Sequence, residues 1–306
     1  MEAFKAGQWN HKQQLAIAGL VLATVCWGGN SVAGRLSVGE IPPVALSFWR
    51  WTLAFVILLL FCGRKVVAER QVIWRYKGKL VLLAITSITS FNTLLYIAAQ
   101  TTQAVNITLV QISLPVVAIV LSIPLLKVFP SKRELLGVLI ALPGLLVIFS
   151  HGNLSALAEL RFGRGDMIMM LATCCWGLYT VLLKRFSIPL NGLVLLTVLV
   201  GMGLCFLSPF YLWEYSLKGG FELDANTALL LTYVVLFASL TAYLSWNHGV
   251  AVLGANTASM FNFLIPVFSA SFAIPILGES LHGYHLVGAS FIFSGIWLAT
   301  RNRVYR

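Results

Sequence analysis

The chain alternates between long apolar runs and short polar segments along its whole length. Ten of the runs approach the ~20 residues that a helix needs to cross a bilayer. They lie at residues 13–36, 42–62, 79–100, 103–126, 132–150, 166–186, 190–213, 226–248, 253–277 and 282–301. The runs lack the alternation of barrel strands, and a helix satisfies its own backbone in lipid. The pattern therefore predicts an all-α integral membrane protein with ten transmembrane helices.

The composition excludes an ordinary soluble protein. Of the 306 residues, 59% are hydrophobic and 10% are charged, and the mean hydropathy is +0.88, whereas soluble domains carry about 25% charged residues. The five cysteines lie inside apolar runs without zinc-ligand spacing, so we expect no metal and no cofactor. The first apolar run is too long for the core of a cleavable signal, and we expect none.

Ten transmembrane helices would place the connecting loops alternately on the two sides of the membrane, and most of the basic residues then fall on one side. With the N-terminus inside, sixteen of the 21 Lys and Arg residues lie in cytoplasmic segments: Lys5, Lys12, Arg64, Lys65, Arg70, Arg75, Lys77, Lys79, Lys127, Lys132, Arg133, Lys184, Arg185, Arg301, Arg303 and Arg306. The other side receives Arg35, Arg161, Arg164 and Lys218. This split follows the positive-inside rule. We therefore expect both termini in the cytoplasm, and we attribute the net charge of +11 to orientation in the membrane rather than to nucleic-acid binding.

The two halves of the chain resemble each other. Residues 22–28 (LATVCWG) return as residues 171–177 (LATCCWG), identical at six of seven positions. Further matches join Pro115 to Pro266 and Gly137 to Gly288. Each half, 1–150 and 151–306, holds five spans, and an odd number inverts the second half relative to the first. Such inverted repeats are typical of secondary transporters, whose site lies near the midplane; a duplicated structural bundle is the alternative.

The repeated motifs resemble those of the drug/metabolite transporter superfamily. The likeness rests on a Trp-Gly early in each half, a proline midway along the fourth and ninth spans, and Gly278-Glu279 closing the ninth. Over nearly its whole length the chain is similar to the ten-helix EamA-type exporters, and most closely to the YddG-type aromatic amino-acid exporters of bacterial inner membranes. The first half departs from the pattern, because Val128 stands where the second half has Glu279. The resemblance implies a multi-pass inner-membrane transporter that is not an enzyme.

Small and polar residues form one helical face in the fourth span and again in the ninth. Gln111 and Asn262 lie on these faces at one repeat-related level, and two bulky amides there favour a water-accessible cavity. Close helix packing is the alternative reading for the smaller residues. Pro115 and Pro266 are predicted to kink their helices, either as gating pivots or as static bends.

Aromatic and amide side chains gather in the middle of four other spans. Trp27 and Trp176 lie beside glycines, far from the interfaces where aromatic belts form, although core packing is also open to them. The candidate substrate-binding residues are Trp27, Asn30, Asn92, Tyr96, Gln111, Trp176, Tyr179, Tyr243, Asn247 and Asn262.

Arg50 is the lone charge inside a span, too deep to extend to the interface. Two roles are open to it, the capture of a substrate carboxylate or bonds to backbone carbonyls of a broken neighbouring helix. No Asp or Glu lies mid-span in this assignment, so coupling to protons or sodium ions is not indicated.

A cavity of aromatic rings, amides and hydroxyls suits small neutral substrates that are partly apolar, whereas phosphates would need clustered Arg or Lys. The leading hypothesis is an exporter of aromatic and other apolar neutral amino acids, working by alternating access. Efflux of other small neutral or drug-like metabolites is the alternative. A channel is less favoured, and an intramembrane enzyme lacks any catalytic motif. The expected partners are the substrate and the lipid bilayer, with no obligate protein partner.

Overall fold

A computed structural model describes residues 10–101, 107, 110–111, 113–150, 153, 163–277 and 283–300, and every regular element in these ranges is a helix. The predicted all-α class is therefore confirmed for the described part of the chain. The elements are α1 (His11–Leu36), α2 (Pro43–Ala68), α3 (Arg70–Arg75), α4 (Lys77–Ala84), η1 (Ile85–Phe91), α5 (Asn92–Ala99), α7 (Leu114–Leu126), α8 (Lys132–Phe149), α9 (Arg164–Phe186), α10 (Gly192–Lys218), α11 (Ala225–Tyr233), η3 (Val234–Thr241), α12 (Ala242–Leu253), α13 (Ala255–Met260), η4 (Phe261–Leu264), α14 (Ile265–Leu277) and α15 (Gly283–Thr300).

Six helical stretches are long and apolar enough to cross a membrane. They are His11–Gly34, Pro43–Ala68, Lys77–Ala99, Arg164–Phe186, Gly192–Lys218 and Ala225–Leu253. They coincide with the first, second, third, sixth, seventh and eighth predicted spans. The other four predicted spans also contain helices, α7, α8, α13 to α14, and α15, which are shorter or interrupted within the described residues.

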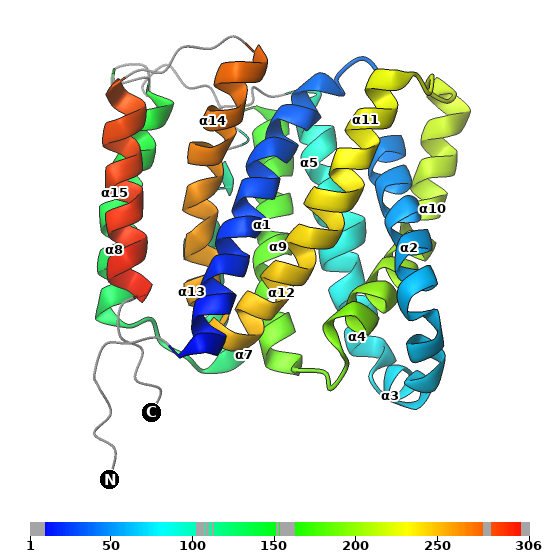
Figure 1. Ribbon diagram of the computed structural model, residues 1–306, viewed down its shortest axis with the longest axis horizontal. Coiled ribbons are helices and arrows are strands. Elements are labelled where there is room, and N and C mark those ends of the chain that lie inside the picture. Colours follow the sequence, from blue (N-terminus) through cyan, green and yellow to red (C-terminus); the bar gives the residue numbers. More distant parts are fainter. Residues whose placement is uncertain are drawn as a thin grey trace.

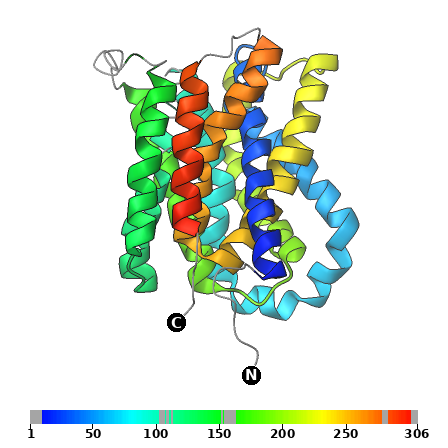
Figure 2. The same ribbon diagram turned by 60° about the vertical axis from the view of Figure 1, so that its left-hand side comes forward.

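The helices run side by side along one axis and form a bundle (Figures 1 and 2). α1 begins and α15 ends at the same end of the bundle, and the short α3 lies at that end too (Figure 1). The basic residues of α3, of the start of α4 and of the start of α8 are therefore gathered there. We call this the basic end; it is the end that the sequence predicts to face the cytoplasm.

Two of the long stretches contain a π-helical segment, η1 in one and η3 in the other. A π-helical turn shifts the backbone hydrogen bonds by one residue, and hydroxyl side chains satisfy some of the displaced carbonyls. Ser239 donates to the Val234 carbonyl at 2.7 Å, and Thr241 donates to the Leu236 carbonyl at 2.9 Å. The hydropathy pattern does not reveal these segments, because they are as apolar as the helices around them.

The helices that carry Pro115 and Pro266 begin only one residue before each proline. α7 starts at Leu114 after a turn, and α14 starts at Ile265 directly after the 3-10 helix η4. Proline is tolerated in a first helical turn, where its missing N–H has no intrahelical partner to lose. The irregular backbone therefore lies on the N-terminal side of each proline.

Four glycines bring α8 and α15 into backbone contact. A Cβ atom on Gly137 would lie 2.6 Å from the Gly295 carbonyl oxygen, and one on Gly144 would lie 2.5 Å from that of Gly288. No side chain fits there, and small residues at helix crossings are the usual means of close packing in membranes. The pair stands together at one side of the bundle (Figure 2).

Candidate functional site

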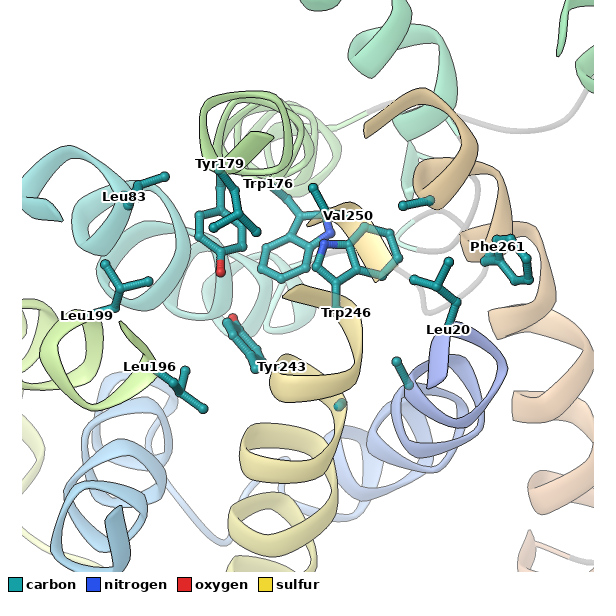
Figure 3. Close-up of a cluster of buried hydrophobic side chains, with 14 of the residues drawn as sticks. Leu20, Leu83, Trp176, Tyr179, Leu196, Leu199, Tyr243, Trp246, Val250 and Phe261 are labelled. Carbon is teal, nitrogen blue, oxygen red and sulfur yellow. The ribbon is translucent and has the colours of Figure 1, made fainter. Parts of the chain in front are cut away.

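A cluster of large aromatic side chains occupies the centre of the bundle, where α1, α9 and α12 meet. The Trp27 ring lies 5.4 Å from that of Trp176 and 5.2 Å from that of Trp246, centroid to centroid. Tyr243 adds a fourth ring, 5.2 Å from Trp176. Figure 3 shows Trp176 and Trp246 pointing toward each other from α9 and α12. These spacings are typical of favourable edge-to-face and tilted aromatic pairs. We call these four residues the aromatic cluster.

Three further rings extend the aromatic cluster, two from the first half of the chain and one from α9. Phe91 lies 4.8 Å from Trp176, and Trp51 lies 4.9 Å from Tyr243. Tyr179 packs 5.0 Å from Trp176 one helical turn along α9. Helix spacing explains the convergence, because residues three or four apart share one face of α9 and of α12.

Arg50 is completely buried beside the aromatic cluster. Its Nε donates to the Ser239 hydroxyl at 2.9 Å, and its Nη1 donates to Asn92 Oδ1 at 3.1 Å and to the Tyr96 hydroxyl at 2.6 Å. The guanidinium also lies 5.0 Å from the centre of the Trp51 ring, a cation–π distance. Its bonds to described residues thus go to neutral side chains, and none goes to the backbone.

Hydrogen bonds continue from Arg50 into the second half of the chain. Asn92 Nδ2 donates to the Tyr243 hydroxyl at 2.9 Å, and that hydroxyl lies 3.4 Å from the Ser87 carbonyl oxygen, to which it donates. Separately, the Tyr179 hydroxyl donates to Asn247 Oδ1 at 2.6 Å. The polar network therefore joins α2, η1 and α5 of the first half to η3 and α12 of the second.

The side chains of the site are packed against one another. Trp246, Tyr179 and Arg50 are all 0% exposed, and Trp176 is 2% exposed. Within the site, three buried N–H donors nevertheless have no hydrogen-bond acceptor among the described residues: Trp51 Nε1, Trp246 Nε1 and Asn247 Nδ2. In this conformation the centre of the bundle is closed. Among its buried polar atoms that lack a partner in the described part of the chain, N–H donors outnumber oxygen acceptors.

Most of the residues proposed from the sequence meet at this site, and three lie elsewhere. The residues brought together are Trp27, Asn92, Tyr96, Trp176, Tyr179, Tyr243, Asn247 and Arg50. Asn262 lies in η4 and donates to the Ser259 carbonyl of its own segment. Gln111 is half-buried just before α7, and Asn30 is buried one turn beyond Trp27 on α1.

Trp51, Trp246 and Ser239 belong to the site and were not predicted from the sequence. A signal existed for Trp246, which lies three residues after Tyr243 on the same helical face. Ser239 could not be placed, because its position opposite Arg50 depends on the π-helical turn of η3. Trp51 stands next to Arg50 in sequence, and only the cation–π geometry reveals it.

Comparison with known proteins gives a consistent picture. The model of the EamA-like transporter family matches residues 14–150 and 163–301. The chain is 26% identical over 271 residues to an uncharacterized transporter, YyaM, of Bacillus subtilis, covering 87% of each protein. It is 24% identical over 296 residues to a probable terminal-alkyne amino-acid exporter of Streptantibioticus cattleyicolor (96% of each).

Two further matches extend this comparison. A probable amino-acid metabolite efflux pump of Salmonella typhimurium is 23% identical over 292 residues, covering 91% of this chain and 92% of that protein. A protein of known crystal structure superimposes with a TM-score of 0.75 at 16% identity, covering 94% of this chain and 97% of that one. At that identity the structural match concerns the fold alone.

Proposed function

The chain belongs to the EamA-like transporter family, and we propose that it exports neutral amino acids with aromatic or other apolar side chains. Membership of the family makes it a membrane transporter. The substrate class, the outward direction and a bacterial inner-membrane location are the proposal. Two of its relatives are named as exporters or efflux pumps for amino acids or their metabolites, at 24% and 23% identity.

One observation carries the choice of substrate: both halves of the chain contribute to one largely buried group of aromatic rings with hydrogen-bonding side chains between them. Trp27 and Asn92 come from the first half, and Trp176 and Tyr243 from the second. Indole and phenol rings can stack on the flat ring of a ligand, while amides and hydroxyls bind its polar end. An aromatic amino acid has both of these parts.

We propose further that the two halves, residues 1–150 and 151–306, are inverted repeats of five transmembrane helices each, with both termini in the cytoplasm. Contacts between helices support this proposal. A contact between a glycine of the first half and a helix of the second half recurs between the equivalent glycine of the second half and the equivalent helix of the first. A Cβ atom on Gly28 of α1 would lie 2.7 Å from Phe268 of α14, and one on Gly177 of α9 would lie 2.6 Å from Val117 of α7. In the same way η1 and η3 interrupt corresponding spans.

Alternating access follows from this arrangement. The rings of the aromatic cluster contact each other in the closed conformation, so a substrate enters only when helices from the two halves move apart. Pro115 and Pro266, each directly after a helix break, are the proposed positions at which the helices bend. The contacts within the cluster would then be exchanged for contacts with the substrate ring.

We test the function with purified protein in liposomes loaded with unlabelled phenylalanine, measuring counterflow of radiolabelled phenylalanine or tryptophan. We expect saturable exchange above the level of protein-free liposomes. Absence of exchange for all twenty amino acids contradicts the proposal, and exchange of other metabolites alone supports the alternative of general efflux. Flux that neither saturates nor shows counterflow indicates a channel.

Trp27→Ala and Trp176→Ala are each expected to lower the exchange rate about tenfold or more. Each removes a ring on which the ring of the substrate would stack, a contact worth about 0.5–1.5 kcal/mol beyond the apolar area that it buries. Gln111→Ala and Asn262→Ala, on the repeat-related faces, are expected to lower it less. Trp213→Ala is the matched control, because that ring lies at the outside of α10 with 66% exposure. Normal exchange in all four variants contradicts the assignment of the site.

A further inference from the structure

Arg50 is a buried cation without a buried anion. Its side chain is 0% exposed, and no carboxylate of the described residues pairs with it. Among the acidic residues of the described helices, Glu214 lies farthest from a helix end. Its carboxylate accepts from the Ala45 N–H at the start of α2 and not from Arg50. The guanidinium therefore places a positive charge in the apolar centre of the bundle.

Neutral partners compensate such a charge only in part. Burial of an ionised group is costly unless it is paired, and charges inside membrane proteins usually pair with one another or mark a ligand pathway. Arg50 has two hydroxyls, one amide oxygen and the Trp51 ring around it. Only a negative charge would compensate the charge of Arg50 fully, and the described part of the chain supplies none beside it.

The surrounding side chains have the same bias toward donors. Trp51 Nε1, Trp246 Nε1 and Asn247 Nδ2 are buried N–H donors without an acceptor. On the helices that carry these donors and on α1, the buried oxygens without a partner among the described residues are Asn30 Oδ1, which only accepts, and the Thr52 hydroxyl, which can also donate. A ligand that offers oxygen atoms and negative charge is therefore favoured over one that offers a cationic ammonium group.

We propose that Arg50 binds the carboxylate of the transported substrate and that this carboxylate, more than the α-amino group, determines recognition. The inference rests on the proposed function and names the chemical class of its substrates as carboxylates with an aromatic or apolar side chain. The carboxylate takes the place of Asn92 Oδ1 or of the Tyr96 hydroxyl at Nη1. Carboxylates are well matched to the planar guanidinium, with which they form two parallel hydrogen bonds.

The position of Arg50 agrees with a ligand whose ring lies in the aromatic cluster. Trp51 contacts both the guanidinium, at 5.0 Å, and the Tyr243 ring, at 4.9 Å. Tyr243 in turn lies 6.1 Å from Trp27. A carboxylate held at Arg50 is thus adjacent to the rings on which the ligand's own ring would stack.

The test is a competition series on the wild-type protein in detergent, with bound radiolabelled phenylalanine as the probe. The competitors are 3-phenylpropionate, which lacks the amino group, and 2-phenylethylamine and phenylalaninamide, which lack the carboxylate. We expect 3-phenylpropionate to compete within about threefold of phenylalanine, and the other two to be at least tenfold weaker. Equal competition by 2-phenylethylamine, or none by 3-phenylpropionate, overturns the proposal.

Two variants separate binding by Arg50 from a structural role. In Arg50→Gln we expect phenylalanine affinity to fall roughly 10- to 100-fold, the loss of a hydrogen bond to a charged group, while indole, which has no carboxylate, binds as to the wild type. Tyr96→Phe removes one partner of Arg50 and keeps the charge, so the preference for carboxylates is retained. Equal losses for indole and phenylalanine in Arg50→Gln contradict the proposal.

The outcomes also distinguish this inference from the proposed function. Absence of phenylalanine binding contradicts amino-acid export, and direct binding of radiolabelled 3-phenylpropionate to the wild type then tests the anion site independently. Binding that is lost in Arg50→Gln supports the site, and no binding overturns it. If Arg50→Gln does not fold, the wild-type competition series decides the question alone.

Discussion

Glu214 shows how one side chain joins the two halves of the bundle near the end opposite the basic end. It is buried near the end of α10, and its Oε2 accepts from the Ala45 N–H at 2.8 Å. Ala45 lies in the first turn of α2, where backbone N–H groups lack intrahelical acceptors and the helix dipole favours a negative charge. Lys218 lies 3.5 Å away and is about half exposed. Glu214 therefore acts as a capping residue supplied by another helix.

Replacing Glu214 tests this capping role. Glu214→Ala is expected to lower the free energy of unfolding by about 1–3 kcal/mol, because a buried N–H loses its charged acceptor. Glu214→Gln keeps an oxygen at the same place and is expected to cost less. Thermal unfolding in detergent measures the difference. Lys218→Ala is the control, and its expected effect is under ~1 kcal/mol because the Lys218 side chain is about half exposed to solvent. Equal melting temperatures for Glu214→Ala and the wild type would contradict the role.

Most of the polar residues of the site could be predicted from the sequence, because a polar or charged side chain deep in an apolar span is costly unless it faces a partner or a cavity. That argument selects Arg50 and Asn92, and the distance of Trp176 from either interface selects that ring as well. The same reasoning does not select Ser239 or Trp51, since a serine or tryptophan in an apolar run is common and only the three-dimensional pairing with Arg50 marks them. It also groups Asn262 with the site, although its amide nitrogen donates within its own segment.

At the scale of helices, the α8–α15 pair depends on residues that have no side chain. Gly137 lies against the carbonyl of Gly295, and Gly144 against that of Gly288. Any larger residue would push the two backbones apart, and the whole length of the contact would loosen. The cost of glycine in a helix, about 1 kcal/mol relative to alanine, is offset here by close packing.

Gly137→Ala and Gly283→Ala should have opposite effects on stability. A Cβ atom on Gly137 would meet the Gly295 carbonyl oxygen at 2.6 Å and the Ala299 Cβ at 2.7 Å, so we expect a loss of roughly 1–3 kcal/mol from overpacking. Gly283 starts α15 with nothing within 4 Å of a new Cβ. Alanine there is expected to be neutral or stabilising by up to about 1 kcal/mol. Thermal unfolding of both variants makes the comparison, and equal shifts would argue against the glycine contact.

Hydropathy predicts where helices lie but not where they break. Each of the ten predicted spans contains helix in the described residues, since a run of apolar residues has no other stable form in lipid. The span predicted at 253–277 divides into α13, η4 and α14, and the spans at 79–100 and 226–248 contain η1 and η3. Proline marks the first of these breaks. The π-helical turns have no comparable marker in the sequence.

At the scale of the whole molecule, the basic end is closed by contacts between the halves. The Ser122 hydroxyl of α7 donates to Asn256 Oδ1 of α13 at 2.7 Å, and Arg185 of α9 donates to the Leu125 carbonyl at 2.7 Å. Both contacts join the last turns of α7 to the second half of the chain. The proposed alternating access requires these two contacts to break whenever the basic end opens.

A cross-link at this position should stop transport. With the five native cysteines replaced, Ser122→Cys and Asn256→Cys are expected to join under mild oxidation, because the two side chains are in contact through a hydrogen bond of 2.7 Å. The linked protein should lose at least about nine-tenths of its counterflow, and reduction should restore it. Each single-cysteine variant under the same oxidant is the control. Full counterflow in the linked protein would mean that this end does not open during transport.

The sequence says more about how the two halves are organised than about which end of the bundle is closed. The repeated sequence motifs and the distribution of basic residues led to the proposal of two inverted halves, and contacts such as Gly28 with Phe268 and Gly177 with Val117 support it. Which end is closed depends on small free-energy differences between conformations that share nearly all their helices. The sequence positions of single residues, Ser122 and Asn256 included, do not reveal which end is closed.

The backbone contact between α8 and α15 has a consequence for how motion is measured. The pair lies at one side of the bundle and packs mainly against α13, η4 and α14 (Figure 1). The backbones of the two helices touch at these glycines, so we expect their separation to stay constant while other helices shift. Spectroscopic labels on these two helices would then give a fixed internal reference, against which displacement of α1 and α9 is measured during a transport cycle.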